Sequence, residues 1–186
     1  MIPPPPPGLR DVAETELVRR FRSGGKRGDE AYSELVERHQ AWLVRLVGYL
    51  LGSFTDAEDV AQEAFVRGFL HRNGLVDDHR FKAWIRVIAT RVAFNARRDQ
   101  ATRQRYLNQI QIRESTMPDA SPEARQLLTE VLGKLPYAFR EILVLRYVEE
   151  LSIADIAQQL DLGESAAKMR LSRARIEFNA MRAKEG

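Results

Sequence analysis

Hydrophobic residues recur at helical spacing along nearly the whole chain, and no segment shows the strict alternation of apolar and polar residues that marks a β-strand. In residues 29–51, for example, Leu35, Trp42 and Leu46 fall on one stripe of a helix. A pattern of this kind predicts an all-α fold. We expect helices over residues 11–22, 29–51, 55–71, 80–104, 122–133, 136–149, 152–160 and 164–182.

Two segments interrupt the helical pattern. Residues 1–10 contain five consecutive prolines, which favour an extended, disordered tail. In residues 105–121 the apolar pattern fades, and Pro118 near the end of this segment, with Pro122 just after it, is incompatible with a continuous helix. The sequence therefore predicts two small four-helix domains, residues 11–104 and 122–186, joined by a flexible linker.

The charged residues are sorted along the chain although their totals nearly balance. Lys and Arg number 29 and Asp and Glu 26, a net charge of +3 at pH 7, which selects no class of partner. Residues 56–63, however, contain four acidic side chains and no basic one. Residues 80–105 contain eight basic side chains against one acidic, and residues 165–184 contain six against one. This pattern predicts contacts with both a polyanion and a basic protein surface.

Composition argues against several classes of site. The chain has no cysteine, which excludes disulfides, cysteine nucleophiles and thiolate metal sites. His39, His71 and His79 lack metal-ligand spacing, His39 fits a core position, and the glycines form no phosphate loop. No apolar run approaches the ~18 residues of a membrane span, and the N-terminus lacks the features of a signal peptide. We expect a cytoplasmic protein without membrane insertion that is not an enzyme and binds no metal or cofactor.

The second domain contains the pattern of a helix-turn-helix. Ile153, Ile156 and Leu160 give a short helix with one buried face, and residues 161–163 form a three-residue turn before the helix at 164–182. In this arrangement the second helix enters the major groove of DNA. A merely solvated basic helix is the alternative.

Local signals fix where some of these helices begin and end. Thr55 with Glu58, and Ser152 with Asp155, are spaced as capping boxes at helix starts. Asp161 occupies the turn, where an aspartate tolerates the left-handed conformation.

The helix at 164–182 has a core face and an outward face. At about 100° per residue, Ala167, Leu171 and Ala174 share the arc that faces the core. The opposite arc carries small, hydroxyl and basic side chains, which suit contacts with base edges and phosphates. The candidate duplex-DNA contacts are Ser165, Lys168, Met169, Ser172 and Arg173.

The helix at 55–71 carries a mixed face. Val66 and Leu70 lie on the same arc as several carboxylates, and apolar residues inside a polar ring are typical of a protein-binding patch. The alternative is that both residues pack against a loop of the same chain. The candidate protein contacts are Asp56, Asp59, Gln62, Glu63 and Val66.

The helix at 80–104 carries a basic stripe beside apolar residues. Lys82, Arg86, Thr90 and Arg97 lie on its far side, opposite the core-like residues. Cationic groups beside apolar surface suit single-stranded or opened nucleic acid, although a solvated surface fits the stripe equally well.

These pieces, in this order, resemble the extracytoplasmic-function (group IV) sigma factors of bacterial RNA polymerase. Residues 56–65 resemble the acidic polymerase-binding motif of that family. Residues 81–85 resemble the helix that meets the minus-ten promoter element, and residues 135–175 resemble the domain that binds the minus-thirty-five element. The resemblance covers roughly residues 10–182.

The resemblance implies a protein that joins core polymerase, directs it to promoters and helps to open the DNA. Asp59, Gln62 and Glu63 would dock on the clamp helices of the largest subunit. The flap of the second-largest subunit would bind the second domain, and an anti-sigma factor is a further expected partner. The loop at 73–80 and the helix that follows would hold the melted strand. The candidate minus-ten contacts are Asn73, Arg80, Lys82, Arg86, Thr90 and Arg97.

The sequence departs from the family pattern at several positions. Arg91 and Asn95 stand where the family commonly has Asn and Asp, and Ala166 with Ala167 replaces a common Thr-Val pair. Met169 replaces a common Ser and should favour an apolar contact such as a thymine methyl group. These departures leave the expected architecture unchanged but make the promoter sequence unpredictable.

Two other functions compete with this interpretation. A stand-alone helix-turn-helix regulator would use the second domain in the same way but would need no acidic docking face. An interaction protein such as an anti-sigma antagonist would not need a basic recognition helix.

Overall fold

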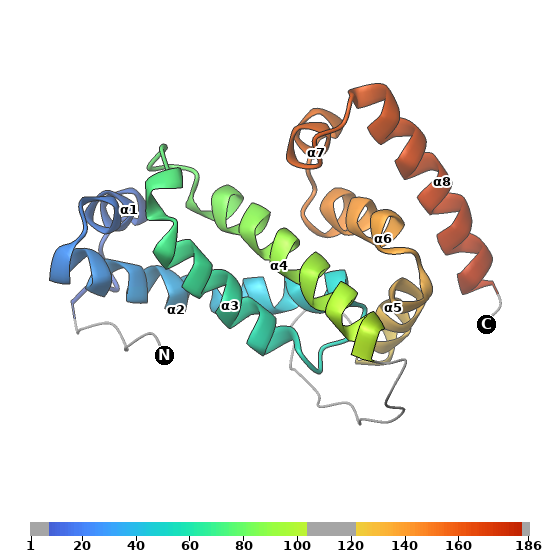
Figure 1. Cartoon of the computed structure of the whole chain (residues 1–186), viewed down its shortest axis with the longest axis horizontal. Coiled ribbons are helices and arrows are strands. Elements are labelled where there is room, and N and C mark those ends of the chain that lie inside the picture. The colour runs from blue at the N-terminus through green and yellow to red at the C-terminus, as the bar shows by residue number, and fades with distance from the viewer. Residues whose placement is uncertain (1–7, 104–121, 184–186) are drawn as a thin grey trace.

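The computed structural model describes residues 8–103 and 122–183, and every regular element in them is helical (Figure 1). The all-α expectation is confirmed. The expected proline tail and linker fall largely outside the described residues. The elements are α1 (Glu14–Ser23), α2 (Gly25–Leu51), α3 (Ala57–Leu70), a 3-10 turn (Arg72–Gly74), α4 (Phe81–Arg103), α5 (Pro122–Lys134), α6 (Tyr137–Leu143), a π-helical turn (Val144–Val148), α7 (Ile153–Gln159) and α8 (Glu164–Arg182).

The first module packs α1, α3 and α4 around the long helix α2. The rings of Phe21 and Tyr32 stack with their centroids 4.3 Å apart, and the Tyr32 hydroxyl donates to the carbonyl of Phe65 on α3 at 2.6 Å. Gly68 permits this close approach, because a Cβ there would lie 2.8 Å from both the Tyr32 hydroxyl and the Ile85 side chain. The four helices are thereby fixed to one another by their buried faces.

Three helix starts differ from the expectation. Helix α1 begins at Glu14 rather than at residue 11. Gly24 and Gly25 form a turn with φ near +70°, but α2 already begins at Gly25 rather than at residue 29. The predicted Thr55 capping box is wrong. Helix α3 begins after Asp56 without a side-chain cap, because the Ser53 hydroxyl donates to Thr55 Oγ1 and accepts from the Thr55 amide, both at 3.2 Å.

The second module, which consists of α5 to α8 with the π-helical turn, contains the expected helix-turn-helix. Ser152 caps α7 by accepting from the Asp155 amide at 3.1 Å, so the N-cap half of the predicted capping box is confirmed. The Asp155 carboxylate accepts from the Ser152 hydroxyl at 2.5 Å. Asp161 in the turn has φ +53°, the left-handed conformation expected of it. Helix α8 then buries Ala167, Leu171 and Ala174, as its periodicity predicted.

A buried arginine joins the two modules. Arg140 is 0% exposed, and its five N–H groups donate to five backbone carbonyls. The carbonyl acceptors belong to the C-terminal ends of α2 (Leu50 and Leu51) and α5 (Leu132 and Gly133), and to Leu135. Helix C-termini carry partial negative charge, which stabilises the cation. Burial still lowers the pKa of Arg140 to about 10.

The modules also touch through glycine backbones. A Cβ on Gly52, which caps α2 with φ +70°, would lie 2.4 Å from Cα of Gly133 on α5. This contact places α5 and α6 beside the C-terminal half of α4 (Figure 1).

Candidate polymerase and nucleic-acid interfaces

The acidic face of α3 lies open to solvent. Asp59, Gln62 and Glu63 are exposed, and Asp56 is half-buried at the start of the helix. Glu63 accepts from Arg67 at 2.7 Å, one turn further on. The face therefore presents carboxylates that a basic partner can reach.

Two apolar residues lie within this acidic face. Val66 is 40% exposed and Leu70 is 71% exposed. The alternative that both pack against an intramolecular loop does not hold in the described part of the chain, because packing of that kind would bury them. Uncovered apolar residues ringed by polar ones are typical of the centre of a protein interface.

Helix α8 presents its predicted outward face. Ala167 and Ala174 are fully buried, while the opposite arc is exposed, including Met169 at 59%. Lys168 lies 3.8 Å from Glu164, a weak surface pair that a phosphate can replace. The candidate contacts that the structure brings together on this face are Ser165, Lys168, Met169, Ser172 and Arg173.

Three of the six candidate minus-ten residues are also accessible. Asn73, Arg80 and Lys82 are exposed at the loop before α4 and at the first turn of that helix. Arg80 pairs with Asp77 at 3.2 Å. The Lys82 ammonium lies 4.8 Å from the centre of the Trp42 ring.

The other three lie against the second module, which the basic-stripe interpretation did not anticipate. Arg86 donates to Gln159 of α7 at 3.0 Å. Thr90 is 4% exposed and accepts from the Gln159 amide at 3.3 Å. Arg97 donates to the carbonyls of Leu51 and Gly133. The expectation of one open stripe is therefore wrong for these residues in this arrangement, because the second module packs on α4.

A cleft of about 400 Å³ lies where α4 faces α6, α7 and α8. Phe94, 48% exposed, lines it together with Arg91, Glu141 and Arg170. Burial raises the pKa of Glu141 to about 7, although the charge of Arg170 acts in the opposite direction. The burial of Glu141 could not be predicted from the sequence, because the cleft is formed by residues far apart in the chain.

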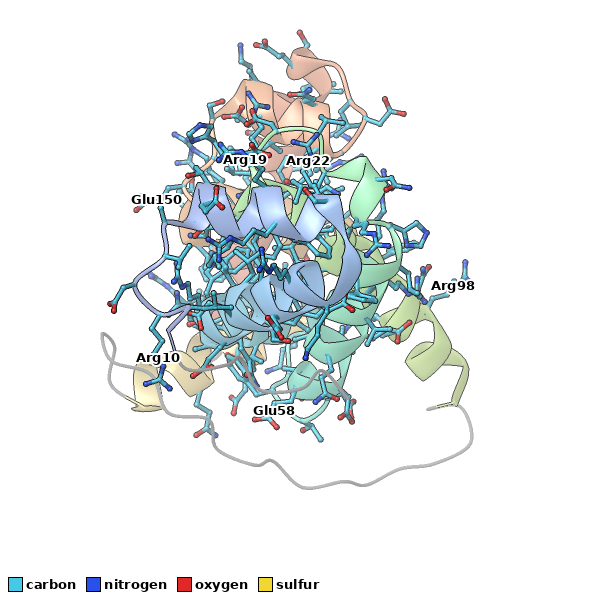
Figure 2. All side chains as sticks on the ribbon, turned by 90° about the vertical axis from the view of Figure 1, so that its left-hand side faces the viewer. Arg10, Arg19, Arg22, Glu58, Arg98 and Glu150 are labelled. Carbon is cyan, nitrogen blue, oxygen red and sulfur yellow. The ribbon has the colours of Figure 1, made fainter. Side chains whose placement is uncertain are left out.

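A second basic cluster also escaped the sequence analysis. Arg19 and Arg22 project side by side from α1 (Figure 2) and line a hollow of about 430 Å³ with Arg72 and Asn73. Asp78 accepts from Arg22 at 2.6 Å and lies 3.5 Å from Arg19, so part of this charge is already neutralised. Arg19 and Arg22 are three positions apart on α1, whereas Arg72 is brought to them only by the fold.

His39 occupies a partly buried position, as its place on the core stripe predicted. Its Nε2 lies 3.1 Å from a carboxylate oxygen of Glu14, and burial holds the pKa of His39 below its ordinary value. Within residues 8–103 and 122–183 no cluster of His, Cys, Asp or Glu could hold a metal ion. In the same ranges, no helix has the length and apolar character needed to cross a membrane.

Two family models match the chain over most of these elements. The model described as Sigma-70 region 2 matches residues 35–103, and the model described as Sigma-70, region 4 matches residues 125–177. The ECF RNA polymerase sigma factor SigW of Bacillus subtilis is 26% identical over 178 residues, which cover 87% of this chain and 94% of SigW. The chain belongs to the extracytoplasmic-function sigma factors. In this sigma factor, the region 2 match includes α3 and α4, and the region 4 match includes α7 and most of α8.

Further relatives agree with this assignment. The ECF RNA polymerase sigma-E factor of Escherichia coli is 28% identical, with 88% of this chain and 91% of that protein covered. The solved structure of CnrH in complex with the cytosolic domain of CnrY is similar with a TM-score of 0.66 and 26% identity, over 93% of this chain and 99% of that one. RpoE of Bartonella quintana, in complex with the anti-sigma factor NepR, shares the fold with a TM-score of 0.65 and 17% identity, over 81% of this chain and 95% of that one.

Proposed function

We propose that this sigma factor docks on core RNA polymerase through the acidic face of α3 and reads promoter DNA with α4 and α8. The observation that carries the proposal is the open α3 face, where Val66 and Leu70 lie uncovered among exposed carboxylates. A stand-alone DNA-binding protein would have no use for that face. The basic partner is expected to be the clamp helices of the largest polymerase subunit.

The two DNA-binding surfaces differ in the form of DNA they suit. Helix α8 follows a helix-turn-helix turn and presents Lys168 and Arg173 outward, as needed to read the minus-thirty-five element in the major groove. The loop before α4 presents Asn73 and Arg80 beside apolar residues, which suits the melted strand of the minus-ten element. Recognition and strand holding would thus be divided between the modules.

The proposed activity is not catalytic, because the sigma factor supplies binding surfaces and leaves the chemistry to the polymerase. The flap of the second-largest subunit is the proposed partner of the second module. An anti-sigma factor is a further proposed partner, supported by the anti-sigma factor found in the complex of the Bartonella quintana relative.

The proposal is tested with bacterial core polymerase. The purified chain should co-elute with core polymerase at micromolar concentration. The reconstituted enzyme should also start transcripts at defined positions on genomic DNA fragments of the source organism, mapped by sequencing of RNA 5′ ends. Failure to bind core, or transcripts no different from those of core alone, would contradict the proposal.

Charge reversal on α3 tests the docking face itself. Asp59→Lys should weaken core binding about tenfold, because a lysine there opposes a basic partner. Glu58→Lys is the matched control: it makes the same change of charge on an exposed residue about 100° around the helix. Thermal melting should be the same for both variants and the wild type. Equal core affinities for the two variants would remove Asp59 from the docking face.

A further inference from the structure

A carboxylate of the second module occupies a cationic position on the first. Glu149 follows the π-helical turn, and its side chain is only 5% exposed. One carboxylate oxygen accepts from the indole N–H of Trp42 at 2.8 Å. The other lies 3.5 Å from the guanidinium of Arg86. Both oxygens are thus held by groups from the first module.

The groups around this carboxylate have a common chemistry. The indole of Trp42 and the guanidinium of Arg86 supply N–H donors, and the Lys82 ammonium lies 4.8 Å from the centre of the Trp42 ring. Trp42 lies on α2, whereas Lys82 and Arg86 lie one turn apart on α4. Within the first module, one cation and one neutral donor therefore hold the carboxylate of the second module, and a second cation, Lys82, lies against the face of the same indole.

A phosphate group satisfies the same donors as a carboxylate. Both are anions with several acceptor oxygens, and charge-assisted bonds from arginine to either are among the stronger hydrogen bonds in proteins. We propose that Trp42, Lys82 and Arg86 form a binding site for a backbone phosphate of single-stranded DNA, and that Glu149 fills this site while the two modules are packed together. The proposal rests on the proposed function and adds Trp42 and Glu149 to it.

This assignment makes strand binding and module packing compete. Thr90 is covered by the same module, and Arg86 also donates to Gln159. A strand can reach these groups only after Glu149 and Gln159 have left. The free sigma factor is then a weak binder of single-stranded DNA, and separation of the modules raises its affinity.

The test measures binding of a fluorescein-labelled single-stranded oligonucleotide of mixed sequence to the full chain, by fluorescence anisotropy at low salt. Glu149→Gln keeps the shape of the side chain but removes the charge that competes with phosphate. We expect its affinity to rise about fivefold or more, the lower end of typical coupling between linked events. Glu150→Gln is the matched control, since Glu150 is the adjacent, exposed glutamate (Figure 2) and the net charge changes equally. Equal affinities for the two variants would overturn the proposal.

A second measurement places the strand at Trp42. The chain contains two tryptophans, so Trp84→Phe leaves Trp42 as the only indole fluorophore. In the Glu149→Gln background, saturating oligonucleotide should change this fluorescence, and Trp42→Phe should reverse at least half of the gain in affinity. Unchanged Trp42 fluorescence at saturation would also overturn the proposal. Circular dichroism melting confirms that each variant is folded.

The experiments distinguish a failure of the Glu149 proposal from a failure of the proposed function. If the wild-type chain directs core polymerase to defined start sites while Glu149→Gln binds the oligonucleotide no better than Glu150→Gln, only the Glu149 assignment fails. If the wild type does not bind core polymerase, the proposed function fails first.

Discussion

Arg140 shows how one side chain can determine the relation between two modules. Its five N–H groups are all used by carbonyls, and the acceptors come from both sides of the junction. A guanidinium has five N–H donors and no acceptor, so it can satisfy the carbonyl groups at the helix ends without needing a hydrogen-bond donor itself. Its neighbours Phe139 and Ile142 lie in an apolar pattern, and an arginine among them is the signal from which its burial could have been inferred.

Removal of this guanidinium should destabilise the chain strongly. Arg140→Met keeps much of the apolar stem but leaves five buried carbonyls without their donor, which should cost about 3–5 kcal/mol, as for other broken buried polar groups. Urea unfolding followed by circular dichroism measures the loss. Arg27→Met, at an exposed arginine of α2, is the control and should change stability by less than about 0.5 kcal/mol. A loss at residue 140 no larger than this would show that the carbonyls find other donors.

At the scale of elements, helix faces were the most predictable feature. The arcs of α3 and α8 follow from a fixed angle per residue, and the Ser152 cap and the Asp161 turn follow from side-chain chemistry within a few residues. The start of α2 and the cap of α3 were less predictable, because two adjacent glycines permit several turns and the hydroxyls of Ser53 and Thr55 bond to each other. Sequence rules therefore predict a cap or a turn correctly when its conformation depends only on residues close by in the chain.

The outward face of α8 makes a separate prediction. Lys168→Ala or Arg173→Ala should each weaken recruitment to the upstream promoter element by ~1–3 kcal/mol if the residue contacts a base edge. DNase footprints of the reconstituted polymerase on a promoter mapped as above measure the effect. Arg182→Ala, at the last residue of the same helix, is the control. Footprints over the upstream element that match the wild type in both test variants would exclude these two residues from the DNA contact.

At the scale of the whole molecule, the structure depends on contacts that no local pattern encodes. Arg86 and Gln159 are separated by 73 residues, and Trp42 and Glu149 by 107. The sequence predicted which residues of α4 face away from its own core, but not that a second module covers three of those four, Arg86, Thr90 and Arg97. Residues 105–121, between the modules, lie outside the described residues and gave no rule for how the modules meet.

The cleft between the modules should make stability depend on pH. The pKa of Glu141 is raised from its ordinary value of 4.5 to about 7 because burial disfavours the charged form. The folded state therefore holds a proton that the unfolded state releases, so this group's contribution is fully present below about pH 4.5 and is lost as the pH rises through 7. The pKa of His39 is lowered by burial, so its contribution to the free energy of unfolding increases with pH instead.

Comparison of variants isolates the contribution of Glu141. Glu141→Gln should lose less unfolding free energy than the wild type between pH 5 and pH 8, as measured by urea unfolding at a series of pH values. Glu150→Gln, at an exposed position, should follow the wild type. A Glu141→Gln profile parallel to that of the wild type would show that Glu141 has an ordinary pKa.

The ends of α2 and α5 meet at a single cation, and this has a mechanical consequence. Both helices direct the negative ends of their dipoles at Arg140, so without the guanidinium the two ends would repel each other. If α2 slid gradually along α5, the partial negative charges at their C-terminal ends would pass each other without the Arg140 cation between them. The contact between the modules should therefore be two-state: the modules are either fully packed together or separated, without partly shifted intermediates.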